Sequence, residues 1–559
     1  MTTDYKTLKF EYQRSADFTL TEPAHHPVVI VGAGPVGLSA AIDLARQGIR
    51  VIVLDDDNCL STGSRALCYA KRTLEILDRL GCGDKVVQKG VSWNVGRVFF
   101  KDKPVYHFDL LPESGHRRPA FVNLQQYYLE GYLYECAQQY PHLEIRWKNK
   151  VTQVENTDAH VVISAETPEG QYTLQADYVI AADGSRSPVR GMLGLESKGR
   201  IFRDRFLIAD VKMKASFPAE RWFWFDPPFH PNQSVLLHRE ADDVWRIDFQ
   251  LGWDADPEEE KKPERVIPRV RALLGEGVEF DLEWVSVYTF ACMRMEKFRH
   301  GRVLFAGDAA HGVSPFGARG ANSGVQDADN LCWKLAMVLR GEAPDSLLDT
   351  YGVEREYAAD ENILNSTRAT DFITPKSAVS RVFRDAVLTL SKNHVFARRL
   401  VNSGRLSLPS AYHASPLNTA DADSFSGFMR PGTPASDAPV TLEGGRQSWF
   451  LDQLKEQFCM LYFADQYTDL TEQIQTLQMH VTSFAHLTIL QVLPKGATIP
   501  RGAKAVIDSE GLLAARYDAQ AGTGYLLRPD QHVSARWKHV DLRQLEAALL
   551  RATHQEKSA

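Results

Sequence analysis

A glycine-rich loop between an apolar segment and an amphipathic helix most constrains the fold of this chain. Val28–Val31 is a short apolar run, typical of a buried parallel strand, and it leads into Gly32-Ala33-Gly34-Pro35-Val36-Gly37, which has GxGxxG spacing. A second apolar run, Val51–Leu54, ends at Asp55. An acid about 20 residues after the first glycine, at the end of the next strand, predicts a dinucleotide site. A glycine turn without a ligand is the alternative.

Each residue of this loop has an expected task. The first glycine permits a tight turn, the second admits a pyrophosphate, and the third lets the helix approach the sheet. The acid binds a ribose hydroxyl. Asp56 and Asp57 are neighbouring carboxylates, but Asp55 directly follows the last leucine of the strand and is preferred.

A second strand, loop and helix unit occupies residues 301–341. Val303–Ala306 is an apolar run, and Gly307-Asp308 follows it. A loop of small residues then leads to a helix with one apolar face from Val325 to Leu339. The free N–H groups and the positive dipole end at the start of such a helix favour an anionic ligand. The alternative is the same unit without a ligand.

A third motif, Asp183-Gly184, follows the predicted strand Tyr178–Ile180. By itself this pair indicates only a turn. The ordered set of GxGxxG, Asp-Gly and Gly-Asp resembles the single-component FAD-dependent aromatic-ring hydroxylases, the class A flavoprotein monooxygenases.

The resemblance implies FAD as cofactor. Asp308 would hold the ribityl chain, Pro315 would lie beside the isoalloxazine, and the backbone of Gly320-Ala321-Asn322 would face flavin N1 and O2. His311 is expected to be structural. The full set of implied FAD contacts is Gly32, Ala33, Gly34, Pro35, Val36, Asp55, Arg65, Gln126, Val151, Asp183, Gly307, Asp308, Pro315, Gly320, Ala321 and Asn322.

The implied fold is α/β: a Rossmann-like FAD-binding domain of the para-hydroxybenzoate hydroxylase type, with an inserted β-sheet substrate domain and a C-terminal thioredoxin-like domain. The expected parts are an N-terminal extension (1–26), the FAD-binding domain (27–205 and 295–345), the substrate domain (206–294), a helical segment with linker (346–425) and the thioredoxin-like domain (426–559). That last domain lacks CxxC, which excludes thiol chemistry. Residues 144–180 are expected to form a β-meander.

The substrate domain offers four pocket candidates. Arg246 and Asp248 alternate with apolar residues along one predicted strand, so they share a face that could line a polar pocket or face solvent. His238 and Tyr288 are the other candidates, and the sequence does not single out a catalytic base among them. Tyr69 or Lys71 could also face the substrate. An aromatic stretch from Arg221 to Pro228 weakly resembles a halogenase motif and is interpreted as a strand edge.

Composition limits the partners. A net charge of −7 argues against nucleic acid. No run approaches the ~18 apolar residues of a membrane span, so no membrane partner is expected. Seven scattered cysteines without CxxC indicate a reducing cytoplasm, and no cluster has metal-ligand spacing, so no metal is expected. A homo-oligomer is expected.

The resemblance implies a monooxygenase that uses NADPH or NADH and O2 to hydroxylate a phenolic or related aromatic substrate through a flavin hydroperoxide. An FAD-dependent epoxidase and a monooxygenase that modifies polycyclic or antibiotic substrates remain alternatives, because fold does not determine substrate. A non-catalytic FAD-containing interaction protein is the alternative from another class.

Overall fold

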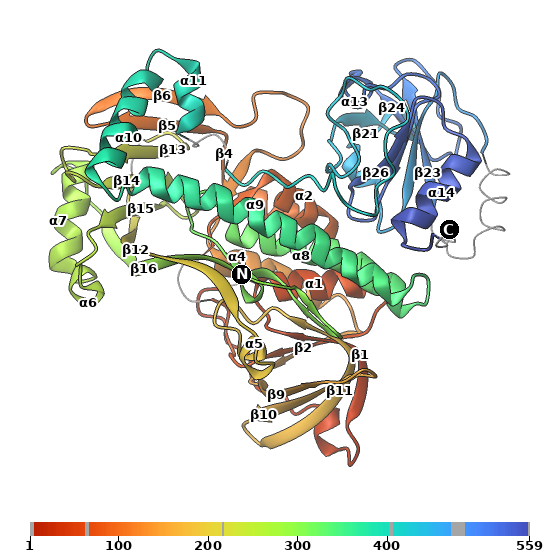
Figure 1. The fold of residues 1–559 in the computed structure, drawn as a ribbon, viewed down its shortest axis with the longest axis horizontal. Coiled ribbons are helices and arrows are strands. Elements are labelled where there is room, and N and C mark those ends of the chain that lie inside the picture. The colour runs from red at the N-terminus through yellow and green to blue at the C-terminus, as the bar shows by residue number, and fades with distance from the viewer. Residues whose placement is uncertain (1–4, 62–65, 215–216, 402–405, 471–486, 557–559) are drawn as a thin grey trace.

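The computed structural model describes residues 5–61, 66–214, 217–401, 406–470 and 487–556. Three parts surround two long helices, α8 (Gly320–Leu339) and α9 (Asp349–Ile373), as Figure 1 shows. A sheet with β1 and β2 forms the lower part of that view, a second sheet lies at the upper left, and the C-terminal part lies at the upper right. None of the helices in these ranges is long and apolar enough to cross a membrane.

The first sheet contains the predicted nucleotide-binding unit. Its strands, in spatial order, are β17 (Arg299–His300), β18 (Val303–Phe305), β11 (Gly170–Ala181), β1 (Ala24–Val31), β2 (Val51–Asp55) and β8 (Leu143–Trp147). Strands β18, β11, β1, β2 and β8 run parallel. The antiparallel strands β9 (Lys150–Asn156) and β10 (Val161–Thr167) extend β11. The meander predicted for 144–180 is therefore wrong at its first strand, because β8 pairs with β2 instead.

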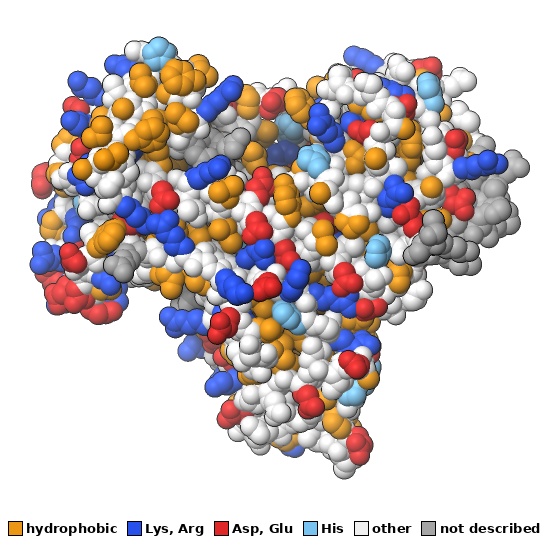
Figure 2. Space-filling model, viewed as in Figure 1, with side chains coloured by type: hydrophobic (Ala, Val, Ile, Leu, Met, Phe, Trp, Pro, Cys, Tyr) orange, Lys and Arg blue, Asp and Glu red, His pale blue; other side chains and the backbone are white. Residues whose placement is uncertain are grey.

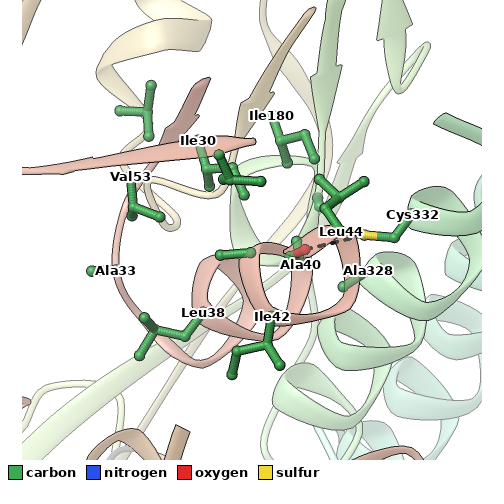
Figure 3. Packing of buried hydrophobic residues seen from close by; sticks show 14 of the residues in the cluster. Ile30, Ala33, Leu38, Ala40, Ile42, Leu44, Val53, Ile180, Ala328 and Cys332 are labelled. Carbon is green, nitrogen blue, oxygen red and sulfur yellow. Dashed lines mark hydrogen bonds between the residues drawn. The ribbon is translucent and has the colours of Figure 1, made fainter. Parts of the chain in front are cut away.

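Helix α1 (Pro35–Arg46) follows β1 and lies between the sheet and α8. Figure 3 shows Ile30, Val53 and Ile180 of three neighbouring strands on one side of α1 and Leu38 and Ile42 on its other side. These five residues and Ala328 of α8 belong to one cluster of buried hydrophobic residues. All six are buried. Burying each large aliphatic side chain contributes about 1.5–3 kcal/mol, so this core fixes the glycine loop between β1 and α1.

The second sheet is built mostly from the predicted substrate domain. Its order is β19 (His311–Gly312), β16 (Asp281–Met295), β12 (Ser197–Lys212), β15 (Val244–Leu251), β14 (Ser234–Arg239), β13 (Arg221–Phe225), β5 (Val95–Phe100) and β6 (Lys103–Asp109). Two strands thus come from residues 95–109, far outside 206–294. The prediction that β13 is a strand edge is wrong, because β5 pairs with it in parallel.

Shorter elements surround the two sheets. A small sheet of β3 (Cys68–Ala70), β7 (Phe121–Asn123) and β4 (Val91–Trp93) lies beside the second sheet. The other helices of the first 401 residues are α2 (Lys71–Leu80), α3 (Gly83–Lys89), α4 (Gln126–Ala137), α5 (Pro188–Met192), α6 (Pro257–Glu260), α7 (Pro263–Leu274), α10 (Ala378–Ser391) and α11 (Val395–Leu400). Single 3-10 turns span Ala16–Thr19, Gly307–Ala309, Asp345–Leu348, Glu443–Gly445 and Leu451–Gln453.

The C-terminal part has its own seven-stranded sheet. The order is β21 (Gln447–Trp449), β20 (Pro439–Thr441), β24 (Ala505–Asp508), β23 (Thr488–Pro494), β22 (Cys459–Phe463), β25 (Gly524–Leu527) and β26 (Val533–Trp537), with helices α13 (Leu512–Arg516) and α14 (Leu542–Ala552). Strands β22, β23 and β24 are parallel, and β25 and β26 are antiparallel to their neighbours. This order is compatible with the thioredoxin-like prediction, which stays a prediction.

A buried charge cluster joins the C-terminal part to α8 and α9. Arg528 donates to Glu354 (Nη1–Oε1, 2.5 Å) and to Asp530, while Lys334 Nζ donates to the other oxygen of Glu354 at 2.8 Å. All four side chains are buried. Within this cluster the bond between Arg528 and Glu354 crosses from the C-terminal part to α9, so it links the C-terminal sheet to the FAD-binding part.

Candidate functional site

The glycines of the first loop serve two different purposes. A Cβ at Gly32 would lie 2.5 Å from the Ala182 carbonyl oxygen, and one at Gly37 would lie 1.9 Å from the Gly32 carbonyl oxygen. A Cβ at Gly34 would meet nothing within 4 Å. Gly34 is also the N-cap of α1, which has no side-chain cap. Gly32 and Gly37 are thus required by packing, whereas Gly34 leaves an open, electropositive helix start.

Asp55 lies where the sequence predicts it, and its carboxylate supports the loop. Its two oxygens accept from the N–H groups of Ala33 (2.6 Å) and Asp57 (2.9 Å). Burial raises the pKa of Asp55 to about 6, despite these hydrogen bonds. The carboxylate therefore fixes the backbone of the glycine loop at Ala33. Its contact with a ribose hydroxyl stays a prediction.

Asp183 presents an unsatisfied acceptor beside the same loop. Its Oδ2 accepts from Val189 N at 3.0 Å, while Oδ1 is buried and has no hydrogen-bond partner among the described residues. Burial raises the pKa of this carboxyl. Gly184 has φ +80°, and a Cβ there would meet nothing within 4 Å. An orphaned buried oxygen beside open space fits a ligand that donates a hydrogen bond.

The start of α8 provides the third part of the site. This helix has no side-chain cap, and the exposed Asp308 carboxylate lies 4.0 Å from the position of a Cβ at Gly320. The Asn322 side chain donates to Cys68 O and accepts from Ala70 N, both at 2.8 Å. That amide is used to attach α8 to β3. The backbone N–H groups of Gly320, Ala321 and Asn322 form the uncapped first turn of α8, and they are the groups predicted to face the flavin.

Val36 of α1 brings the first and third parts together. Its Cγ2 lies 2.9 Å from a Cβ position at Gly307 and 2.5 Å from one at Gly324, so larger residues at either glycine would collide with α1.

The other residues predicted to contact FAD lie in different surroundings. The Gln126 side chain accepts a hydrogen bond from Ala66 N and donates one to Glu130, each at 2.8 Å. Val151 is buried in β9, and Pro315 is exposed. Arg65 lies outside the described residues.

Several known proteins are similar to this chain. A family model described as an FAD-binding domain matches residues 25–366. A 3-(3-hydroxy-phenyl)propionate/3-hydroxycinnamic acid hydroxylase of Mycobacterium sp. (strain JLS) is 28% identical over 91% of this chain and 88% of its own. A probable NADH-specific resorcinol 4-hydroxylase of Rhodococcus jostii (strain RHA1) is 34% identical over 59% of this chain and 62% of its own.

The chain belongs to the FAD-dependent aromatic hydroxylases. The crystal structure of the flavin-dependent monooxygenase PieE, with FAD and substrate, shares the fold: its TM-score is 0.79 at 21% identity, covering 96% of this chain and all of that one. FAD is the cofactor of the hydroxylase, with a nicotinamide co-substrate. The residues present fit FAD: two uncapped helix starts, two glycines facing open space and the orphaned Asp183 oxygen are complementary to a dinucleotide.

The substrate sheet presents a row of buried polar side chains toward β3. His238 of β14 is opposite Arg246 of β15, which is opposite Asp210 of β12. Arg246 donates to both Asp210 oxygens at 2.8 Å. The predicted strand face of Arg246 and Asp248 is thus buried, and the solvent-facing alternative is wrong. Arg246 is occupied by Asp210 and joins two strands.

His238 and Asp248 lie in this row with unsatisfied atoms. His238 Nε2 is 4.0 Å from Asp248 Oδ2, and neither His238 Nε2 nor Asp248 Oδ1 has a hydrogen-bond partner in the described chain. Burial, with Arg221 and Arg246 nearby, holds the pKa of His238 well below its usual range. Burial raises the pKa of Asp248 to about 6, and the two arginines oppose this rise.

Two residues that the sequence interpretation missed complete the group. Arg221 is 97% buried, its Nε has no hydrogen-bond partner among the described residues, and its Nη1 lies 3.9 Å from Cys68 Sγ. Cys68 Sγ is also 3.9 Å from His238 Nδ1. The alternation Arg221-x-Phe223-x-Phe225 was a sequence signal that could have placed Arg221 on the pocket face. We call Cys68, Arg221, His238 and Asp248 the polar group.

An apolar pocket lies on the sheet face that carries Arg221, His238 and Asp248. It is partly open to solvent, and its walls are Phe223, Phe225, Phe316, Gly317, Arg319, Asn365, Ala369, Ile373, Val401 and Leu406. Phe223 is two residues from Arg221 on the same strand face, and Leu406 packs in one cluster with Cys68. Phe316 lies in the loop before α8, so the pocket lies between the substrate sheet and the predicted flavin loop.

The remaining candidates lie elsewhere. Tyr288 is half-buried on β16 beside Trp284 (ring centroids 6.1 Å apart) and belongs to neither the polar group nor the pocket walls. Tyr69 is fully buried in the core of the FAD-binding part, and Lys71 forms an ion pair with Glu75. Because successive strand residues point to opposite faces, Cys68 faces the substrate sheet where Tyr69 cannot.

Proposed function

We propose that this hydroxylase acts on a single-ring phenol, bound in the apolar pocket with its hydroxyl group at the polar group. The observation that carries the proposal is that three buried polar atoms lie on the sheet face whose Phe223 and Phe225 wall the apolar pocket. These atoms are Arg221 Nε, His238 Nε2 and Asp248 Oδ1, and none has a hydrogen-bond partner among the described residues. Buried polar atoms without partners are rare and mark sites where a ligand or water belongs.

When bound, FAD would supply the oxygen chemistry, in which NADH or NADPH provides two electrons, one atom of O2 is added to the ring and the other is released as water. The residues of the chain prepare the substrate. Asp248, as a carboxylate above pH 6, accepts the phenolic proton, and the neutral His238 imidazole donates a hydrogen bond to the same oxygen. Arg221 stabilises the phenolate that forms, which makes the ring more electron-rich. The phenylalanine walls exclude water.

The named relatives support a single ring. The relatives named above act, by their names, on resorcinol and on a hydroxyphenyl acid, both single phenolic rings. No specific feature of the pocket favours the polycyclic or epoxidase alternatives. The individual FAD contacts, cytoplasmic location and homo-oligomeric state are retained as parts of this proposal.

The test is consumption of NADH and NADPH by the FAD-loaded protein with a panel of phenols, with product masses. The panel contains resorcinol, hydroxybenzoates, 3-(3-hydroxyphenyl)propionate and one polycyclic phenol. The proposal expects faster oxidation with a single-ring phenol and a product heavier by one oxygen atom. Acceleration by the polycyclic phenol alone would contradict it.

A further inference from the structure

Helices α10 and α11 carry an apolar surface that faces solvent. Seven large apolar side chains are exposed by 44–80%: Val379, Val382, Phe383, Leu390, Val395, Phe396 and Leu400. Figure 2 shows orange side chains gathered over these two helices at the upper left of the molecule. Soluble proteins rarely expose contiguous apolar patches above a few hundred Å², and larger ones mark interaction sites. We call these residues the exposed helix surface.

This surface is not the result of a helix that has failed to dock. Val387 and Leu388 of α10 are buried in one cluster with Phe225 and Ile373. The helix therefore packs one apolar face on the substrate sheet and presents a second to solvent. Packing explains the first face and leaves the second without a function inside the chain.

The charge around the exposed helix surface is positive. Residues 376–401, all of which the structure describes, contain six Lys or Arg and a single acid, Asp385, in a chain whose net charge is −7. Asp385 is already paired with Arg384 (Nε–Oδ1, 3.0 Å). The exposed cations are Arg381, Lys392 and Arg399, whereas Lys376 Nζ lies 3.9 Å from carboxylate oxygens of both Asp204 and Asp371. Apolar and basic side chains thus share one face of the molecule.

We propose that α10 and α11 form a docking surface for an anionic lipid membrane. Exposed Phe, Leu and Val side chains enter the boundary between headgroups and acyl chains, while Lys and Arg bind the anionic headgroups. A second copy is less suited, because a two-fold contact of this surface with itself would bring the same cations together. The sequence argued against a membrane partner only through the absence of a span, which a surface-bound helix pair does not need.

The surface adjoins the substrate pocket. Ile373, which ends α9 before α10, and Val401, directly after α11, both line that pocket. Docking would place this wall of the pocket at the membrane, so that an apolar phenol could enter from lipid. This consequence rests on the proposed function, whereas the docking does not.

The test is flotation of the full-length, FAD-loaded protein with vesicles of phosphatidylcholine alone and of phosphatidylcholine with phosphatidylglycerol. The variants are Phe383→Ser with Phe396→Ser, Lys392→Glu with Arg399→Glu, and the control Phe428→Ser, which is 89% exposed and outside the surface. We expect binding to anionic vesicles at least tenfold above phosphatidylcholine, a loss of at least tenfold in both double variants, and no change in the control. Raising the salt concentration should weaken binding.

Equal or absent binding to the two vesicle types would overturn the proposal. Sedimentation velocity in the absence of lipid provides the second readout. A wild-type dimer that the Phe383→Ser and Phe396→Ser changes dissociate would assign the surface to a second copy instead, and would also overturn it. Flavin absorbance confirms that each variant is folded. Phenol-dependent NADH oxidation is measured separately, so failure of the proposed function would be distinguished from failure of docking.

Discussion

His238 Nε2 and Asp248 Oδ2 lie 4.0 Å apart on neighbouring strands, and their common surroundings shift their pKa values toward each other. Burial lowers the pKa of His238 and raises that of Asp248 to about 6. At neutral pH the pair is therefore a neutral imidazole beside a carboxylate. This is the protonation state in which Asp248 can accept a phenolic proton.

The first prediction concerns the pH dependence that Asp248 imposes. We expect kcat/KM to rise as pH increases through about 6, because Asp248 must lose its proton to act as a base. Asp248→Asn should lower kcat/KM by about 10²–10⁴ and remove this acid limb, as measured by initial rates from pH 5 to 9. A variant that kept the acid limb would assign it to another group.

Stability gives an independent check on the same residue. A carboxyl whose folded pKa is raised contributes stability below its unfolded pKa of about 3.9 and loses that contribution as pH rises through about 6. Ionised Asp248 is thus unfavourable for folding at pH 7. Asp248→Asn should leave the Tm at pH 7 unchanged or higher while activity falls, whereas a clear fall in Tm would indicate a structural role.

Two arginines of the substrate sheet should respond differently to truncation. Arg246 is paired with Asp210, so Arg246→Gln leaves a buried carboxylate and should destabilise the protein by about 3–5 kcal/mol. Arg221 Nε has no partner, so Arg221→Gln should cost less stability and instead lower phenol-dependent kcat/KM by tenfold or more. Urea unfolding and steady-state kinetics measure the two effects, and equal loss of stability in both variants would contradict this division.

The glycines of the first loop provide a matched pair. A Cβ at Gly34 has no described atom within 4 Å, so Gly34→Ala should fold normally and lose at least tenfold in FAD affinity, because the methyl group occupies space left for the pyrophosphate. Gly37→Ala would place its Cβ 1.9 Å from the Gly32 carbonyl oxygen and should destabilise the flavin-free protein itself. Flavin fluorescence titration and thermal unfolding without FAD distinguish them. Normal FAD binding by Gly34→Ala would refute the assigned role.

The buried cluster at the C-terminal junction makes a prediction about domain attachment. Glu354→Gln leaves Lys334 and Arg528 buried with reduced compensation and should cost about 3–5 kcal/mol. The exposed pair Lys198–Glu296 is the control, and Glu296→Gln should change stability by no more than about 0.5 kcal/mol. Faster proteolysis between residues 409 and 430 in Glu354→Gln alone would confirm loosening at the junction, while unchanged cleavage would argue against it.

Local patterns in the sequence determined the cofactor half of this protein. The spacing of Gly32, Gly34, Gly37 and Asp55 specifies a strand, a turn and a helix whose geometry depends on residues close in the chain. The structure places Asp55 at the predicted end of β2, where it accepts from Ala33 N of the glycine loop, and Asp308 beside the start of α8. Alternation along β15 likewise showed that Arg246 and Asp248 share a face.

Only the tertiary structure decided which residues pack against the face of β15 that carries Arg246 and Asp248. Strand alternation cannot tell a solvated face from a buried one. It also cannot show that Arg246 Nε donates to Asp210 while Arg221 Nε has no partner among the described residues. The polar group joins Cys68 to residues more than 150 positions away, and β5 pairs with β13 across a separation of about 125 positions, as between Gly96 and Arg221. Such contacts depend on how strands pair across long separations, which no local spacing encodes. The sequence by itself thus determined the FAD-binding frame, and long-range strand pairing decided which side chains surround the substrate.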